Sequence, residues 1–179
     1  MTSPDEQPAI RVEVRAAADL TVAELAHIHE VEERLEWGAP PDVQWGHPQW
    51  HVLVWQGDTL VGHAGLVRRT ITVDGQSVEA GGLSGVWSLE SERGQGHAKR
   101  AVVMAVAYAC RDLAIANMLL LCREHVAAFY QRLGWERVEA PVTFDQPAGL
   151  YRWPALAMTL SCDGTQFPAG AIDLCGLPW

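Results

Sequence analysis

Apolar and polar residues alternate along several stretches of the chain, which is the pattern of half-buried β-strands. Ile10–Arg15 and Trp50–Gln56 follow it, and Leu60–Val73 is the longest example. Asp74-Gly75 is a strong hairpin signal, so this long strand is expected to pair with a following one, Ser77–Leu89. The first half of the chain therefore predicts antiparallel pairing.

Three other stretches repeat apolar residues at helical spacing. Thr21 and Glu24 form a capping-box pattern at the start of the first, and Gly134 is a normal C-cap for the last. The predicted helices are Val22–Leu35, a helix that follows Ala98 and runs to Leu113, and Val126–Leu133.

Two short apolar runs, Asn117–Cys122 and Leu156–Leu160, are predicted to be strands. The order is then strand, helix, three antiparallel strands, helix, strand, helix, strand. This order predicts an α/β fold with a mixed, mostly antiparallel sheet flanked by helices. A length of 179 residues suggests a single domain. Within it we expect residues 1–8 to be flexible and residues 163–179 to form a C-terminal tail.

The net charge of −9 argues against a nucleic-acid partner and permits a cationic substrate. No apolar run approaches the roughly 20 residues that span a bilayer, and the first residues lack signal-peptide character. We therefore expect a cytoplasmic protein with no membrane partner. The four cysteines form no CxxC pair and the histidines no HExxH motif, so no metal is predicted. All four cysteines are expected to be buried structural residues.

The segment with the clearest chemistry is a glycine-rich turn between a strand and a helix, Arg93-Gly94-Gln95-Gly96-His97-Ala98. The first N–H groups of a helix have no acceptor within the helix and lie at its positive end. Glycines leave those donors uncovered, so a pyrophosphate can bind there. The turn lacks the GxGxxG pattern of dinucleotide sites and the GK[ST] of a Walker loop, which argues against both ligands.

This turn resembles the R/Q-x-x-G-x-G/A motif of the GCN5-related N-acetyltransferase (GNAT) superfamily. A second block, Phe129–Trp135, resembles the FYxKxGF segment of the same superfamily. The order of predicted elements is also similar to that fold, and the resemblance covers the chain from Ile10 to about Ser161.

The resemblance implies that acetyl-CoA binds as the acyl donor. The strand before the turn would separate from its neighbour, and its backbone near Val86 and Ser88 would pair with the pantetheine arm. Amides of the turn would hold the pyrophosphate. The implied cofactor-binding residues are Val86, Trp87, Ser88, Arg93, Gly94, Gln95, Gly96, His97, Ala98 and Arg132.

Tyr130 matches the superfamily position that protonates the departing thiolate of coenzyme A, and a phenol is a sensible acid for that step. The general base stays open. Ser84 stands where related enzymes carry a glutamate, while Glu124 and Glu79 are the nearest acidic candidates. We therefore predict Tyr130, Glu124 and Ser84 as catalytic-site positions.

A narrower resemblance is to the aminoglycoside 2′-N-acetyltransferases. It rests on the strand blocks that begin at His51 and Gly62, on an acidic loop residue at Asp42, and on the segment from Asp173 to Trp179. It implies that Asp42, Asp173 and Trp179 bind the acceptor.

The sequence therefore predicts an N-acetyltransferase that uses acetyl-CoA and acts by direct transfer on a small polar amine, with aminoglycosides as one candidate class. Three alternatives stay open: a non-catalytic acyl-CoA sensor, a longer acyl chain, and a protein acceptor. Assembly is also open, with a homodimer as one state.

Overall fold

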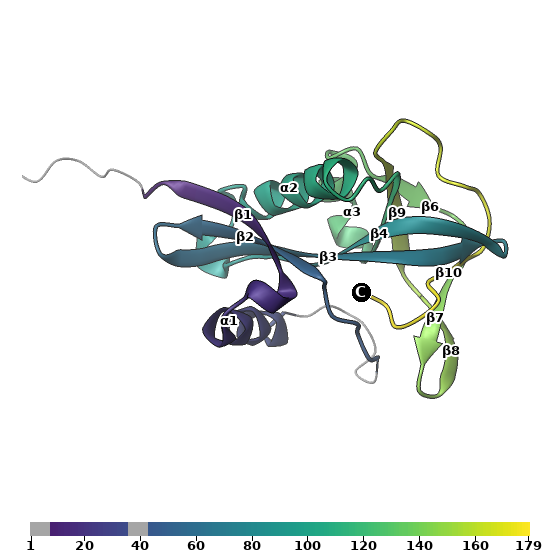
Figure 1. Cartoon of the computed structure of the whole chain (residues 1–179), viewed down its shortest axis with the longest axis horizontal. Coiled ribbons are helices and arrows are strands. Elements are labelled where there is room, and N and C mark those ends of the chain that lie inside the picture. The colour runs from purple at the N-terminus through teal and green to yellow at the C-terminus, as the bar shows by residue number, and fades with distance from the viewer. Residues whose placement is uncertain (1–7, 36–42) are drawn as a thin grey trace, which may run out of the picture.

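Ten strands of the described residues, 8–35 and 43–179, form one mixed sheet in the computed structural model (Figure 1). They are β1 (Ile10–Ala16), β2 (Trp50–Gln56), β3 (Thr59–Val73), β4 (Gln76–Ser88), β5 (Asn117–Cys122), β6 (Glu136–Val138), β7 (Val142–Gln146), β8 (Gly149–Arg152), β9 (Leu156–Ser161) and β10 (Ile172–Asp173). The helices are α1 (Val22–Glu33), α2 (His97–Arg111) and α3 (Glu124–Gln131), with 3₁₀ turns η1 (Ala17–Asp19) and η2 (Glu90–Glu92).

The strands from β1 to β4 pair antiparallel in chain order, β4 and β5 pair parallel, and β5 continues antiparallel to β9 and then to β6. At the other side, β10 joins the far end of β3 to the hairpin of β7 and β8. The predicted mixed, mostly antiparallel sheet with flanking helices is confirmed. The sequence pattern missed β6, β7, β8 and β10, which are short.

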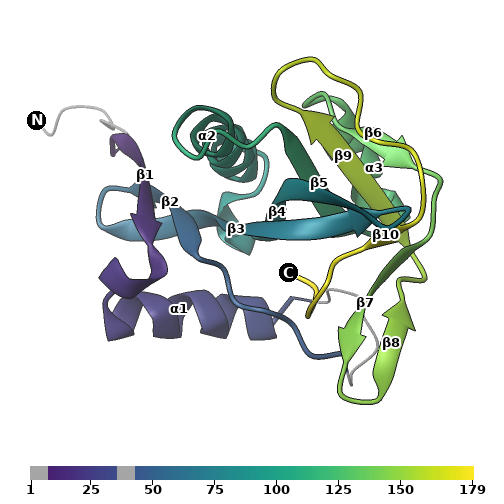
Figure 2. The same ribbon diagram turned by 45° about the vertical axis from the view of Figure 1, so that its right-hand side comes forward.

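The helices cover opposite faces of the sheet: α2 and α3 lie on one side and α1 on the other (Figures 1 and 2). The core on the α2 side includes Ala105 of α2 and Leu83 of β4. The core under α1 includes Ile28 and Leu53. The predicted capping box at the start of α1 is present, with the Thr21 hydroxyl accepting from the Glu24 amide at 3.2 Å.

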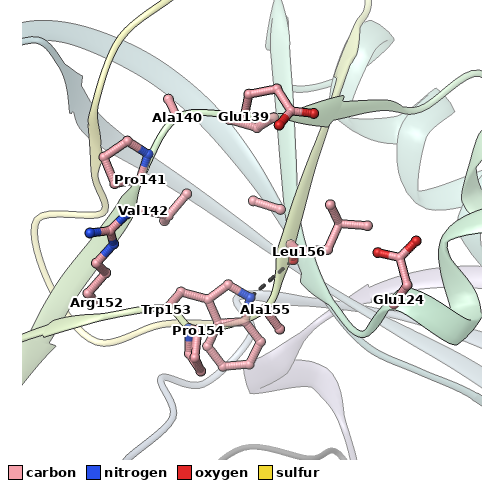
Figure 3. A pocket seen from close by; sticks show the side chains of 12 residues that line it. Glu124, Glu139, Ala140, Pro141, Val142, Arg152, Trp153, Pro154, Ala155 and Leu156 are labelled. Carbon is pink, nitrogen blue, oxygen red and sulfur yellow. Dashed lines mark hydrogen bonds between the residues drawn. The ribbon is translucent and has the colours of Figure 1, made fainter.

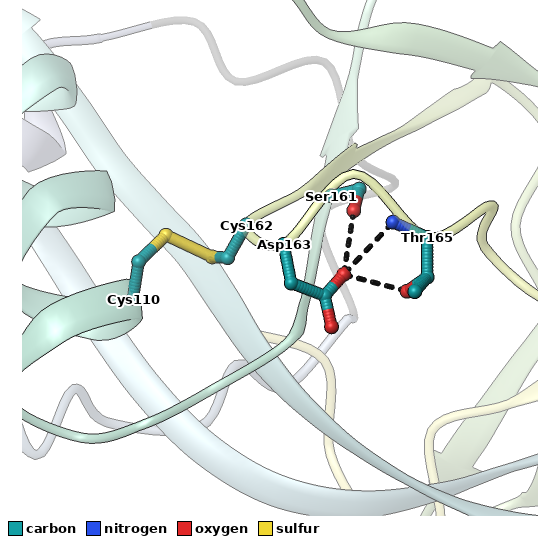
Figure 4. Close-up of a disulfide and its surroundings, with 5 residues drawn as sticks. All are labelled: Cys110, Ser161, Cys162, Asp163 and Thr165. Atoms are coloured by element: carbon teal, nitrogen blue, oxygen red, sulfur yellow. Dashed lines mark hydrogen bonds between the residues drawn. A yellow bond between two sulfur atoms is a disulfide. The ribbon is translucent and has the colours of Figure 1, made fainter.

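The cysteines differ from the prediction that all four are buried structural residues. Cys110, in the last turn of α2, forms a disulfide with Cys162, which follows β9 (Figure 4). Beside it, the carboxylate of Asp163 accepts hydrogen bonds from Ser161 and Thr165 and shapes the turn after β9. Cys122 is buried, whereas Cys175 is exposed. The apolar segment around Cys110 suggested burial but carried no signal for its disulfide partner, 52 residues away.

The segment after β9 returns to the sheet on the α1 side, where the chain ends (Figure 2). The Trp179 indole is 3% exposed and donates to the Leu119 carbonyl at 3.3 Å. A Cβ on Gly82 would lie 2.1 Å from the indole, so the absence of a side chain there makes room for the ring. Arg69 lies 5.2 Å from the ring centre and donates to the Leu177 carbonyl at 2.6 Å, which fixes the tail.

None of the described helices is both long and apolar enough to cross a membrane.

We expect Trp179→Ala to lower the free energy of unfolding by about 3–5 kcal/mol, because it removes a buried aromatic side chain and leaves a cavity. Urea unfolding followed by circular dichroism measures the effect. Leu150→Ala is the control, since that side chain is 65% exposed and its truncation should change stability by less than about 0.5 kcal/mol. Equal midpoints for the two variants would contradict the packing of the tail.

Candidate active site

The central feature of the site is the separation of β4 from β5. The two strands pair from Ala80 to Leu83 with Asn117 to Leu120, and the pairing stops there although both strands continue. On the β5 side, the backbone of β4 from Ser84 to Ser88 has no strand partner among the described residues. Unpaired backbone groups of this kind can form hydrogen bonds with an extended ligand, as in strand addition.

A β-bulge lies at the same place. His63 of β3 pairs with Trp87 and Gly65 pairs with Ser84, so β4 contains one residue more than β3 between these pairs. Gly85 occupies the bulge with a φ of 52°, in the left-handed region that favours glycine. A Cβ on Gly65 would meet Ser84 Oγ, and one on Gly85 would meet Glu32 Oε1 of α1.

The glycine-rich turn follows directly after β4 and η2. Gly94 and Gly96 have φ values of 83° and 81°, so both need the left-handed region. Gly96 is the N-cap of α2, and the first amide of α2 with a recorded backbone acceptor is that of Arg100, bonded to the Gly96 carbonyl at 3.0 Å. The preceding amides of the helix are therefore donors at its positive end, available to an anion.

The predicted cofactor-binding residues of the turn differ in solvent exposure. Arg93, Gly94, Gln95 and Gly96 are exposed, whereas His97 is 2% exposed and packs where a Cβ on Gly62 would lie. Among the described residues, neither ring nitrogen of His97 has a hydrogen-bond partner. Its imidazole therefore supports the turn from beneath and does not face a ligand.

The side chains of β4 beyond the bulge point to opposite faces of the sheet. Val86 packs on the α2 side, and Trp87 is buried on the α1 side, stacked on His63 at 5.5 Å between ring centres. Ser88, at the end of the strand, is half-buried. Any ligand contact from these three residues is therefore expected from the backbone. Arg132 is exposed at the C-cap of α3.

Tyr130 lies in α3 with its ring 9% exposed, edge-on to Phe129 and Trp135. Burial raises the pKa of its phenol above the ordinary value, with a smaller contribution from Cys122. The phenol therefore keeps its proton at neutral pH, as a proton donor must. Tyr130 and Cys122, the last residue of β5, belong to the same buried cluster on the α2 side of the sheet.

Both predicted acidic bases are paired with arginines. Glu124 hydrogen-bonds to two nitrogens of Arg137, and that contact lowers the pKa of its carboxyl. Glu79 is bound in the same way by Arg68 at 2.6 and 3.0 Å, with the same effect on its pKa. Stabilised carboxylates of this kind are weaker bases.

Glu124 also lies at the rim of an open hollow of about 740 Å³ (Figure 3). The hollow is otherwise lined by residues 138–142 and 152–157, where the chain crosses between the two ends of the sheet. Trp153 is one of the lining residues and donates to the Leu156 carbonyl at 3.1 Å. The Glu124 carboxylate accepts hydrogen bonds from Arg137.

A polar cluster that the sequence analysis did not identify lies beneath the bulge, on the α1 side. His51 Nδ1 is 2.9 Å from His63 Nε2, and His63 Nδ1 is 2.7 Å from the Gly85 carbonyl. Burial lowers the pKa of His51 to about 4 and that of His63 to about 3, so both are neutral at pH 7. Glu32 Oε1 lies 3.8 Å from His63 Nδ1, and burial raises the pKa of its carboxyl to about 7.

Of the three predicted acceptor residues, the structure describes Asp173 and Trp179. Asp42 lies outside the described residues. Asp173 is in β10, where its carboxylate accepts from the Cys175 amide at 2.9 Å. Trp179 is buried beneath Gly82. A role for these residues in acceptor binding stays a prediction, and the Trp179 indole is committed to the core.

Comparison with known proteins assigns the family. Residues 21–138 match the family model described as an acetyltransferase (GNAT) domain. The chain belongs to the GNAT acetyltransferase family. This membership supports acyltransferase activity. No curated protein matches this GNAT protein in sequence, and the narrower likeness to aminoglycoside 2′-N-acetyltransferases stays a prediction.

Solved structures share its fold. One is the GNAT family N-acetyltransferase YhbS from Escherichia coli in complex with CoA, at 18% identity and a TM-score of 0.57 over 99% of this chain and 98% of that one. A second is a GNAT family acetyltransferase from Brucella melitensis in complex with acetyl-CoA, at 15% identity and a TM-score of 0.59 over 90% of this chain and 94% of that one. A third is FeeM, an N-acyl amino acid synthase from uncultured soil microbes, at 13% identity and a TM-score of 0.56 over 87% of this chain and 93% of that one.

The cluster around Glu32 gives a prediction on stability. The pKa of Glu32 is raised in the folded state, from 4.5 to about 7, so the folded state binds this proton more tightly than the unfolded state. Its contribution to stability is complete below pH 4.5 and is lost as the pH rises through 7. Glu32→Gln should therefore gain stability relative to the unmodified protein between pH 4.5 and 7, by at most about 3 kcal/mol.

Urea unfolding at several pH values between 4 and 8 measures this difference. Glu33→Gln is the control, because Glu33 is the exposed neighbour on α1 and its substitution should give a nearly pH-independent difference. A pH-independent difference for Glu32→Gln as well would mean that the carboxyl titrates normally.

Proposed function

We propose that this GNAT protein transfers an acetyl group from acetyl-CoA to the amine of a small polar molecule, by direct attack within a ternary complex. The observation that carries the proposal is that three features follow one another along the chain: the β4 backbone without a β5 partner, the glycines with left-handed φ, and the start of α2. Together they offer backbone donors and acceptors to an extended chain and then a set of donors to a pyrophosphate.

Coenzyme A has this layout, with a pantetheine arm that carries amides and a pyrophosphate beyond it. Arg93, Lys99 and Arg100 are exposed around the turn and would add positive charge. The E. coli and Brucella structures with the same fold contain CoA and acetyl-CoA, which supports this ligand class here. The acyl group would then lie near the bulge, where β4 leaves β5.

Catalysis in this proposal depends on positioning the amine against the thioester, with proton transfers at both ends. The amine nitrogen bonds to the acyl carbon, the C–S bond breaks, and the thiolate of CoA takes a proton. Tyr130 is the proposed donor of that proton. The phenol is protonated at neutral pH, as this role requires, although its raised pKa makes it a weaker acid than an exposed tyrosine.

For the acceptor we propose a polar amine, with aminoglycosides as one candidate class. The net charge of −9 supports attraction of a cationic acceptor. We propose that Asp42 and Asp173 contribute to its binding, and that nucleic acid and membrane are not partners; a homodimer is compatible with the proposal. A longer acyl chain is a second candidate for the donor, because FeeM, with a similar fold, is an N-acyl amino acid synthase.

A cytoplasmic location is part of the same proposal, and the Cys110–Cys162 disulfide is the feature that argues against it, because such bonds are more typical of oxidising compartments.

The cofactor assignment predicts that the chain binds CoA with a Kd in the micromolar range and that Gly96→Glu weakens binding by more than about 100-fold. The glutamate would place a side chain and a negative charge against the pyrophosphate. Isothermal calorimetry with CoA measures both values. The control is Gly164→Glu, because Gly164 has the same φ of 81° and nothing within 4 Å of its Cβ position. Wild-type affinity in Gly96→Glu would contradict the phosphate-binding turn.

The acid role predicts that Tyr130→Phe lowers kcat by about 100-fold while the Kd for CoA changes little, since only the hydroxyl is removed. Thiol release from acetyl-CoA with a panel of amines measures turnover, and the same panel identifies the acceptor. Tyr151→Phe in β8 is the control for loss of a tyrosine hydroxyl. An unchanged kcat in Tyr130→Phe would remove this residue from the mechanism.

A further inference from the structure

The β4 bulge changes which side chains of that strand face α1. Gly82 faces the buried Trp179, and Leu83 packs on the α2 side, so the two faces alternate normally up to this point. Ser84 and Gly85 then both face the α1 side, because the bulge adds one residue. The acyl site of the proposed function and the polar cluster beneath the bulge are therefore separated only by the backbone at Gly85.

The direction of the hydrogen bonds in this cluster follows from its acceptor. A carbonyl oxygen can only accept, so His63 Nδ1 donates to Gly85 O at 2.7 Å. The imidazole of His63 is neutral, so its Nε2 is an acceptor and the proton in the 2.9 Å contact belongs to His51 Nδ1. The two histidines thus form a chain of hydrogen bonds that ends on the Gly85 carbonyl. Both ring nitrogens of His63 are used in this chain, so His63 cannot take a proton from a substrate.

Glu32 is the strongest base of the cluster, because burial lowers the pKa of His51 to about 4 and raises that of Glu32 to about 7. Its Oε1 lies 2.6 Å from the position that a Cβ on Gly85 would occupy, so the carboxyl covers the side-chain face of the bulge. Its side chain is 27% exposed, whereas that of His63 is fully buried. The 3.8 Å approach of Glu32 to His63 is not an ion pair at neutral pH, because that imidazole is uncharged.

We propose that Glu32 is the general base of the acyl transfer and that the acceptor amine enters between α1 and the β4 bulge. This inference rests on the proposed function. The Glu32 carboxylate takes a proton from the ammonium form of the acceptor, and the free amine then attacks the thioester carbon. As the C–S bond breaks, the attacking nitrogen, now positively charged, loses its second proton to water and the thiolate takes a proton from Tyr130. Tyr130 is then reprotonated from water, and Glu32 returns its proton to water.

The surroundings of Glu32 suit this task. Burial raises the pKa of its carboxyl to about 7, so near neutral pH it is present partly as carboxylate and is still basic enough to take a proton. Of the titratable groups around it, His63 from β3 lies 3.8 Å away, and His51 from β2 is bonded to His63. The charge of His29, on the same helix as Glu32, acts on both strand histidines. The facing residues of β4, Ser84 and Gly85, do not titrate.

The test compares Glu32→Gln with Glu33→Gln, its exposed neighbour on α1. Acetyl-CoA is the donor, and spermidine, glucosamine, lysine and kanamycin are the probe amines, with thiol release as the readout between pH 5.5 and 9. In the unmodified protein and in Glu33→Gln, kcat/KM should rise with pH through an apparent pKa of about 7. In Glu32→Gln, kcat should fall by about 100-fold and the rise of kcat/KM with pH should disappear, while calorimetry shows unchanged CoA binding.

Hydroxylamine supplies a second arm, because it is a weakly basic amine that is already neutral at pH 7 and needs no base to free its lone pair. The defect of Glu32→Gln should be much smaller with this acceptor. An equal defect with hydroxylamine, or an unchanged pH profile in Glu32→Gln, overturns the role of Glu32 alone. Absence of thiol release with every amine in the unmodified protein, despite CoA binding, overturns the proposed function and this role with it.

Discussion

The site depends on one constraint: β4 stops pairing with β5 after Leu83 while both strands continue. A sheet interior normally satisfies its backbone groups through neighbouring strands, and a buried group without a partner costs about 1–3 kcal/mol. Backbone groups that are left unpaired at such a place are best satisfied by a ligand or by water. The bulge at Gly85 helps to end the pairing, because the extra residue changes the direction of β4 at that point.

Each of the three helices has a different position relative to the point where β4 and β5 separate. α2 begins just beyond the end of β4, so its free amides extend the line of donors that starts on the strand. α3 follows β5 and places Tyr130 on the same face as α2. α1 covers the opposite face and brings Glu32 to Gly85. In the proposed function, cofactor and proton acceptor therefore lie on opposite faces of one strand, and the absence of a side chain at Gly85 leaves room for the Glu32 carboxyl.

The sequence predicted the parts of the fold that have a local signal. The long hairpin followed from Asp74-Gly75, and the start of α1 from its capping box, because both depend on neighbouring residues. The short strands β6 and β10 have two or three residues and are held by pairing with distant strands, so periodicity does not reveal them. The same reason hid the disulfide between Cys110 and Cys162 and the burial of Trp179, which packs against Gly82.

For the candidate site, the proposed phosphate turn could be predicted because it is contiguous. The proposed base, Glu32, could not, because its neighbours His63 and Gly85 come from two strands that lie far along the chain. Sequence position favoured Glu79 and Glu124, yet both lie against arginines that stabilise the carboxylate. Glu32 has the same side chain in a helix that looks ordinary in sequence, with an exposed glutamate beside it. What distinguishes it is an environment that penalises charge, made by burial against a neutral histidine and a glycine of another strand. The basicity of a carboxylate is therefore a property of the folded surroundings, and spacing along the chain does not encode it.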